Sequence, residues 1–139
     1  MDLFSRKIIA HRVSDTNDMA LVKETFLSAF ESRGEPHNVI FHSDQGAQYV
    51  AYDFRMLLKS KEVRQSFSKP ACPYDNAVIE KFFSTFKQEE YAHDAHLPLN
   101  ELIPAIDNYI NEYYNAYRPH EKLGGLTPTQ AEEKHANSI

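Results

Sequence analysis

The sequence predicts an α/β fold, because short strand-like runs alternate with longer helical patterns along the chain. Residues 7–13 are apolar and β-branched, residues 39–42 form a brief apolar run typical of a buried strand, and residues 63–68 are a third candidate strand. Apolar side chains recur at helical spacing between these runs. With 139 residues the chain is long enough for one domain, and we expect residues 1–139 to form a single domain.

Two helices are predicted in the first half of the chain. In residues 18–33 apolar side chains recur every three or four positions, after a turn that is rich in capping residues. Gly34 follows this pattern and suits a C-terminal cap. The second helix is expected over residues 49–61, between the second and third candidate strands.

The second half of the chain is predicted to be helical. Two prolines exclude regular structure in residues 69–74. A helix is then expected that is capped by Asp75 or Asn76 and runs to about Tyr91. Residues 99–117 form an amphipathic, tyrosine-rich pattern with Pro104 near its start, where a missing N–H is tolerated. Thr127 is expected to cap a last, short helix.

Composition limits the possible classes of function. The net charge is −5 and the isoelectric point is about 5.8, which argues against a free-standing DNA-binding module. DNA chemistry is still possible, since a bound metal offsets acids in an active site. No apolar run approaches the ~20 residues of a membrane span, and the amino terminus lacks the layout of a signal peptide. No membrane partner is therefore expected. Cys72 is the single cysteine, which excludes an intrachain disulfide, so we expect a cytoplasmic protein.

Asp44 and Glu80 are the candidate catalytic and metal-binding residues. Asp44 directly follows the second strand-like run, and Glu80 lies near the start of a predicted helix. Their positions differ by 36, so 35 residues lie between them. Two convergent carboxylates are hard oxygen ligands that suit Mg²⁺ or Mn²⁺, a combination that indicates phosphodiester chemistry. Each acid alone also has a simpler explanation, an Asx turn with Gly46 for Asp44 and a favourable helix-dipole position for Glu80.

Four basic side chains are candidates for DNA binding. Lys87 lies seven residues after Glu80, within ~20° of it around an α-helix, so both Lys81 and Lys87 are suited to contact phosphates beside a metal. Arg118 and His120 end the tyrosine-rich helix and are suited to hold a phosphate. The alternative is a solvated helix face for the lysines and capping of the helix C-terminus for Arg118 and His120.

Four segments stand out when the chain is taken in order: Asp2–Ile9, His42–Tyr49, residues of Asp75–Glu89 and residues of Tyr114–Pro128. They resemble bacterial insertion-sequence transposases with an integrase-type catalytic core. They are spread from residue 2 to residue 128, so the match extends over nearly all of the chain, and the 35-residue spacing of the two acids is that of the family. The segments are Asp2–Ile9, similar to a turn and the third strand of the core; His42–Tyr49, similar to the second-aspartate motif; residues of Asp75–Glu89, similar to the glutamate helix; and residues of Tyr114–Pro128, similar to the C-terminal signature.

This resemblance implies an RNase H-like fold, in which a mixed sheet is flanked by helices, and a triad of two aspartates and one glutamate. By position Asp44 is the second acid and Glu80 the third, and the three acids of the family share two Mg²⁺ ions. The implied activity is metal-dependent cleavage and strand transfer of DNA, with transposon ends and target DNA as partners. Lys87 resembles a lysine that contacts donor-end DNA in related integrases.

The first acid of the family is the main departure. In the family it lies on the first strand, upstream of the segment that matches Asp2. We therefore expect a fragment of a longer transposase that lacks this acid, the first strand and most of the second, and is inactive alone. Its exposed strand edges are expected to drive homo-oligomerisation, for example as an element-swapped dimer. Two alternatives are an inactive remnant that self-associates or binds DNA without cutting it, and a related nuclease that uses two acids.

Overall fold

The computed structural model describes residues 1–138, apart from the side chain of Pro73, and the chain forms two compact units. The first, named the strand unit, is Ala10–Ala77. The second, named the helical unit, combines Met1–Ile9 with Val78–Ile139, so segments from both ends of the chain belong to it.

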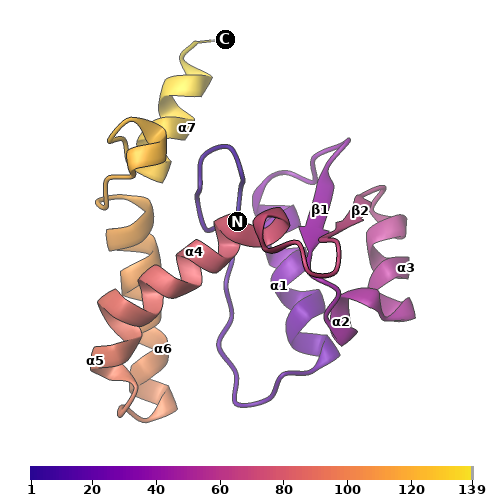
Figure 1. Cartoon of the computed structure of the whole chain (residues 1–139), viewed down its shortest axis with the longest axis horizontal. Helices are drawn as coiled ribbons and strands as arrows, with labels where there is room; N and C mark the ends of the chain where they lie inside the picture. The colour runs from indigo at the N-terminus through magenta and orange to yellow at the C-terminus, as the bar shows by residue number, and fades with distance from the viewer. Residues whose placement is uncertain (139) are drawn as a thin grey trace. The chain divides into compact units, whose positions relative to one another are not determined.

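The strand unit is built around two parallel strands with helices beside them (Figure 1). Its elements in chain order are α1 (Met19–Ser32), β1 (Ile40–Ser43), α2 (Ala47–Val50), α3 (Tyr52–Ser60), β2 (Arg64–Phe67) and the 3₁₀ helix η1 (Pro73–Asn76). β1 and β2 pair in parallel, with Ile40 opposite Arg64 and Ser43 opposite Phe67. Because parallel neighbours need a crossover connection, the helices α2 and α3 lie between them in the chain.

Aromatic rings form the core of the strand unit. Phe26 and Phe30 lie one turn apart on α1, and both are buried. Phe54 of α3 is fully buried, with its ring centroid 5.9 Å from that of Phe26 in an edge-on arrangement. Leu58 and Val63 complete the buried cluster. Burial of a side chain of this size stabilises a fold by about 1.5–3 kcal/mol, so this cluster is the main source of stability in the unit.

The helices expected in this unit are confirmed, with one break. α1 begins after Asp18, whose Oδ1 accepts a hydrogen bond from Leu21 N at 2.9 Å and caps the helix. Gly34 has a φ of +72°, the left-handed conformation that a C-terminal glycine supplies. The single helix predicted over residues 49–61 is divided at Ala51, which is extended.

Two helical rods dominate the helical unit. Its elements are α4 (Ala77–Phe86), the π turn η2 (Lys87–Tyr91), α5 (Ala92–Asp94), α6 (Leu99–Asn108), the π turn η3 (Tyr109–Asn115), the 3₁₀ helix η4 (Glu121–Leu123) and α7 (Pro128–Ala136). The first rod is α4 followed by η2 and α5, and the second rod is α6 followed by η3 (Figure 1). Aromatic rings join the two rods, with centroids 4.9 Å apart for Phe82 and Tyr114 and 5.5 Å for Phe86 and Tyr109.

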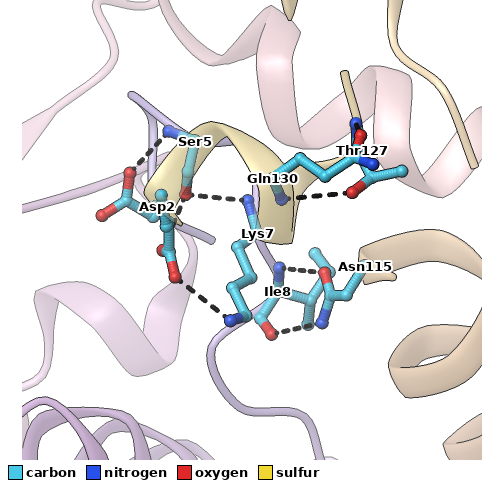
Figure 2. Close-up of polar contacts among 8 residues, drawn as sticks. Asp2, Ser5, Lys7, Ile8, Asn115, Thr127 and Gln130 are labelled. Atoms are coloured by element: carbon cyan, nitrogen blue, oxygen red, sulfur yellow. Dashed lines mark hydrogen bonds and ion pairs between the residues drawn. The ribbon is translucent and has the colours of Figure 1, made fainter. Parts of the chain in front are cut away.

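The helix ends agree with the sequence in one case and differ in another. Thr127 caps α7 as predicted, in a capping box in which Gln130 N donates to Thr127 Oγ1 and Thr127 N donates to Gln130 Oε1 (Figure 2). Pro104 lies inside α6 rather than in its first turn and removes one helical hydrogen bond there. Within residues 1–138, none of the helices combines the length and apolar character that crossing a membrane requires.

The strand predicted over residues 7–13 is wrong. The described residues form one sheet, in which β1 and β2 are parallel to each other, and residues 7–13 belong to neither strand. Instead, Ile8 N donates to Asn115 Oδ1 at 2.9 Å, and Asn115 Nδ2 donates to Ile8 O at 3.0 Å (Figure 2). A strand needs a backbone neighbour for its polar groups, and here the amide of one side chain takes that place. The β-branched composition therefore indicated burial, which Ile8 has, but not strand pairing.

Candidate active site

Asp44 lies directly after the carboxyl end of β1, and its side chain is exposed. Its Oδ1 accepts a hydrogen bond from Gly46 N at 2.9 Å, and its backbone oxygen accepts one from Ser43 Oγ at 2.8 Å. Only Oδ1 of this carboxylate is engaged in a hydrogen bond within residues 1–138. The Asx turn considered as an alternative is therefore present, and it leaves the second oxygen available to a ligand.

Gly46 allows the carboxylate to approach the backbone closely. Its φ of −56° is open to any residue, but a Cβ built on Gly46 would lie 3.0 Å from Asp44 Oδ1 and 3.4 Å from the Tyr49 ring. Burial of Tyr49, and then the negative charge of Asp44, raise the pKa of the Tyr49 phenol. The Asp44 carboxylate thus lies against the backbone of Gly46, and the Tyr49 phenol nearby stays neutral.

A hydrogen-bonded brace that sequence reasoning missed lies beside this turn. His42 Nδ1 lies 3.0 Å from Ser66 Oγ and its Nε2 lies 3.1 Å from Ser68 Oγ, so one imidazole spans two positions at the end of β2. Gln45 Nε2 donates to Ser68 O at 3.0 Å. Because β1 and β2 are parallel, their carboxyl ends meet at one edge, and these bonds fix the loop that carries Asp44 to that edge.

Glu80 lies in the first turn of α4 in the helical unit, and its side chain is exposed. Lys81 beside it is exposed, as is Lys87, the first residue of the π turn η2. Within residues 1–138 these three side chains make no hydrogen bond or ion pair. Asp44 belongs to the strand unit and Glu80 to the helical unit, so the convergence of the two acids stays a prediction. Among the described residues, no three His, Cys, Asp or Glu side chains gather in a way that could hold a metal ion.

Arg118 is engaged within the helical unit. Its Nε donates to both oxygens of Glu89 at 3.0 Å and its Nη2 donates to Glu89 Oε1 at 2.8 Å, while Tyr109 Oη donates to Oε2 at 2.8 Å. Burial alone would raise the pKa of Glu89, but the hydrogen bonds from Arg118 and Tyr109 outweigh it and lower this pKa. The Glu89 carboxylate in turn raises the pKa of Arg118. Both charges of the pair are therefore retained over a wide pH range.

His120 also turns inward. Its ring packs edge-on against Tyr114 with centroids 4.8 Å apart, and its Nε2 is buried without a hydrogen-bond partner in the described part of the chain. Burial lowers the pKa of His120 below its ordinary value, although a hydrogen bond to the Tyr114 backbone partly opposes this. The imidazole is therefore neutral at physiological pH, a poor state for holding a phosphate.

A second set of contacts that the sequence did not reveal ties the amino-terminal segment to the rest of the helical unit (Figure 2). Besides the Ile8–Asn115 pair, Ser5 Oγ donates to Glu132 Oε1 at 2.9 Å and Lys7 Nζ donates to Glu132 Oε2 at 3.1 Å. Ser5 and Asn115 are both buried. Partners as much as 127 residues apart carry no local sequence signal, which is why these contacts were missed.

Two family models match this sequence. A model described as the integrase core domain matches residues 1–73, and a second model with the same description matches residues 61–128. The matches overlap at residues 61–73, and each includes residues of both units.

Curated proteins similar to this chain come from insertion sequences. The chain is 38% identical over 136 residues to the transposase InsF for insertion sequence IS3A of Escherichia coli (strain K12). This match covers 97% of this chain and 47% of that protein. It is 32% identical over 134 residues to an uncharacterized 31 kDa protein of insertion element IS600 of Shigella sonnei, which covers 96% of this chain and 49% of that protein. The chain thus spans about half the length of the curated relatives it matches.

Two solved structures have a similar fold. The catalytic core domain of BIV integrase matches with a TM-score of 0.65 and 20% identity, over 97% of this chain and 84% of that chain. A chain of the simian T-cell lymphotropic virus intasome in complex with PP2A regulatory subunit B56 gamma matches with a TM-score of 0.66 and 18% identity, over 85% of this chain and 41% of that chain. The fold is therefore that of the RNase H-like integrase catalytic cores, as expected. This chain belongs to the integrase core domain family.

Proposed function

We propose that this chain is part of the catalytic core of an insertion-sequence transposase, which cleaves DNA strands and joins them to new sites in a metal-dependent reaction. The observation that carries the proposal is the 38% identity, over 97% of this chain, to a transposase of an insertion sequence. Because the chain spans about half of such relatives, the activity is proposed for the complete protein. To that protein this chain contributes Asp44 and Glu80 as catalytic, metal-binding acids.

The donor chemistry of the two acids fits Mg²⁺ or Mn²⁺. Both carboxylates are exposed, and within residues 1–138 the Asp44 turn leaves one oxygen unused while the Glu80 side chain makes no hydrogen bond. Hard oxygen donors prefer these ions to softer metals. Asp44 and Glu80 would hold the metal, which when bound supplies charge stabilisation at the phosphate under attack. The Gly46 N–H orients the Asp44 carboxylate for that role.

Lys81 and Lys87 are proposed to bind the phosphates of transposon-end or target DNA. Both are exposed on the helical rod that carries Glu80, and neither is paired with an acid in the described part of the chain. The sequence also suggests Arg118 and His120 as DNA contacts. In the helical unit the Arg118 side chain is hydrogen-bonded to Glu89, and Nε2 of His120 is buried. Their contacts favour an indirect role in DNA binding.

The two units are proposed to form one core domain that assembles into a homo-oligomer and acts on DNA in the bacterial cytoplasm. Each family-model match spans residues of both units, which supports a single domain. Among the described residues β1 and β2 each have one strand neighbour, so each has an outer edge without a strand partner. Unpaired edges of this kind favour association with another chain, including exchange of an element between copies.

Titration with Mn²⁺ tests the metal assignment in this chain itself. We expect the Asp44→Asn and Glu80→Gln variants each to lose Mn²⁺ affinity, because each removes one charged ligand. Asp15→Asn in the strand unit and Glu112→Gln in the helical unit are matched controls, since both remove an exposed acid elsewhere. Equal Mn²⁺ binding by all five proteins would reject the metal site.

A labelled duplex carrying the terminal sequence of the element tests the reaction. The complete transposase should yield joined products in Mg²⁺ or Mn²⁺, and the same Asp44→Asn and Glu80→Gln changes should abolish them while the fold is kept. Cleaved but unjoined products in every condition would favour the related nuclease instead. Duplex binding without either product would favour the inactive remnant.

A further inference from the structure

A carboxylate on the rod that carries Glu80 is held by three donor atoms. Glu89 lies nine residues after Glu80, in the π turn that continues α4. It accepts hydrogen bonds of 2.8–3.0 Å from Nε and Nη2 of Arg118 and from Oη of Tyr109. A planar guanidinium that donates to both oxygens of a carboxylate fixes orientation as well as distance. Side-chain exposures of 25% for Arg118 and 30% for Glu89 mean that water screens this pair only in part.

The aromatic contacts between the two rods do not supply the same constraint. Phe82 packs on Tyr114 and Phe86 on Tyr109, and such ring pairs tolerate a range of offsets and tilts. Two π turns also interrupt the regular helical repeat next to these rings. Rotation of the first rod about this seam would move Lys87, which lies two residues before Glu89, around the helix axis. The hydrogen bonds of Glu89 to Arg118 and to Tyr109 oppose that rotation, and the two-oxygen contact with Arg118 is the one that fixes orientation.

We propose that Glu89 and Arg118 form a positioning pair, which holds the rod bearing Glu80 and Lys87 so that Lys87 meets DNA phosphate. This inference rests on the proposed function. Arg118 then acts through Lys87 and does not itself contact DNA. A phosphate that captured the guanidinium would leave the Glu89 carboxylate partly buried and beside a second anion, an unfavourable arrangement.

The direction in which one substitution changes DNA affinity separates this positioning role from a direct contact between Arg118 and DNA. Glu89→Gln removes a negative charge, keeps the size of the side chain and releases the Arg118 guanidinium from a charged partner. If Arg118 bound phosphate directly, this change would strengthen DNA binding. If the pair positions Lys87, the change weakens DNA binding although the protein becomes less acidic. Glu90→Gln is the matched control, because it makes the same change in charge one residue away and does not touch Arg118.

Affinity of the full chain for a fluorescein-labelled mixed-sequence duplex is measured in EDTA over a range of salt concentrations. We expect Glu89→Gln to weaken binding about threefold or more and to lower the salt slope by about one ion, as Lys87→Ala does. Adding Lys87→Ala to Glu89→Gln should then have little further effect. Glu90→Gln should bind as tightly as the unaltered chain or more tightly. Thermal unfolding followed by circular dichroism checks that each variant is folded.

Three results would overturn the positioning pair. One is a Glu89→Gln protein that binds like Glu90→Gln, another is tighter binding with a steeper salt slope, and the third is a full effect of Lys87→Ala in the Glu89→Gln background. Because EDTA removes the metal, these results do not depend on Asp44 or Glu80. Failure of the proposed function appears separately, as Mn²⁺ binding that the Asp44→Asn and Glu80→Gln variants leave unchanged.

Discussion

The two units hold their candidate catalytic residues in different ways. In the strand unit, Asp44 is fixed by Gly46, two residues further along the chain. In the helical unit, the rod that carries Glu80 is fixed by Arg118, which is 29 residues from its partner Glu89, and the first segment of the chain is fixed by Asn115, 107 residues from Ile8. The Asp44 carboxylate is therefore oriented by a local turn, in a loop that His42 and Gln45 also hold to the end of β2. The helical unit relies on contacts between residues that are far apart in the chain.

The largest expected effect lies in the core of the strand unit. Phe54→Ala removes a ring that is 0% exposed, and we expect a loss of about 3–5 kcal/mol in the free energy of unfolding, because the cavity cannot close fully. Urea unfolding measures it, with Tyr52→Ala as the control, since Tyr52 is 73% exposed two residues earlier. Hydrogen exchange of the two units sharpens the comparison by showing whether the helical unit is equally affected. Equal stability of the Phe54→Ala and Tyr52→Ala proteins would contradict this account of the core.

The next effect concerns the long-range contacts of the helical unit. Asn115→Ala leaves the N–H and C=O of buried Ile8 without partners, and we expect a loss of about 2–4 kcal/mol in the free energy of unfolding. Asn111→Ala, at an exposed position on the same helical rod, should change stability by less than about 0.5 kcal/mol. If both variants unfold at the same urea concentration, the side-chain clasp on Ile8 contributes nothing measurable.

A smaller effect is expected in the Asp44 turn. Gly46→Ala suits the backbone conformation, but its Cβ presses on Asp44 Oδ1, so we expect Mn²⁺ affinity to fall by up to about tenfold. The free energy of unfolding should change by less than about 1 kcal/mol, since the side chain that moves is exposed. Combining Gly46→Ala with Asp44→Asn separates the causes. Additive losses of Mn²⁺ affinity would mean that Gly46 does not act through Asp44.

The smallest effect is a pH dependence confined to the helical unit. Burial lowers the pKa of His120, so between its folded pKa and its ordinary value the unfolded chain binds more protons than the folded chain. The contribution of neutral His120 to the free energy of unfolding is therefore complete above about pH 6.5, and it is lost as the pH falls below that value. Glu89, whose pKa is also lowered, behaves in the same way below about pH 4.3.

Urea unfolding between about pH 7 and pH 5 measures the effect of His120. We expect His120→Gln to lose less stability across this interval than the unaltered chain does. His96→Gln is the matched control, because His96 is exposed in the same unit. An unchanged pH dependence in His120→Gln would show that protonation of this imidazole carries no penalty in the folded state.

The sequence predicted features that depend on neighbouring residues better than features that depend on residues far apart in the chain. The helix α1, the Gly34 cap and the Thr127 cap all depend on residues a few positions apart, and local spacing was sufficient to predict them. The strand predicted over residues 7–13 was wrong because β-branched composition reports a preference, whereas pairing depends on a neighbour that the pattern does not contain.

The candidate site divides in the same manner. The place of Asp44 directly after a strand is confirmed, and so is the Asx turn that was its alternative explanation. Its role as a catalytic and metal-binding acid stays a prediction. The partners of Arg118 and the brace from His42 to Ser66 and Ser68 were not predicted, because their members come from separate elements. The meeting of Asp44 with Glu80 stays a prediction, since the two acids lie in different units.

The amide of Asn115 has a consequence for how copies of this chain associate. A strand paired with Ile8 would present a second edge, to which another strand could pair. The side-chain amide of Asn115 instead bonds to the N–H and C=O of Ile8 and presents no further strand edge. Growth by strand addition therefore stops at this point of the helical unit. Within residues 1–138, the strand edges to which another strand could pair are the outer edges of β1 and β2.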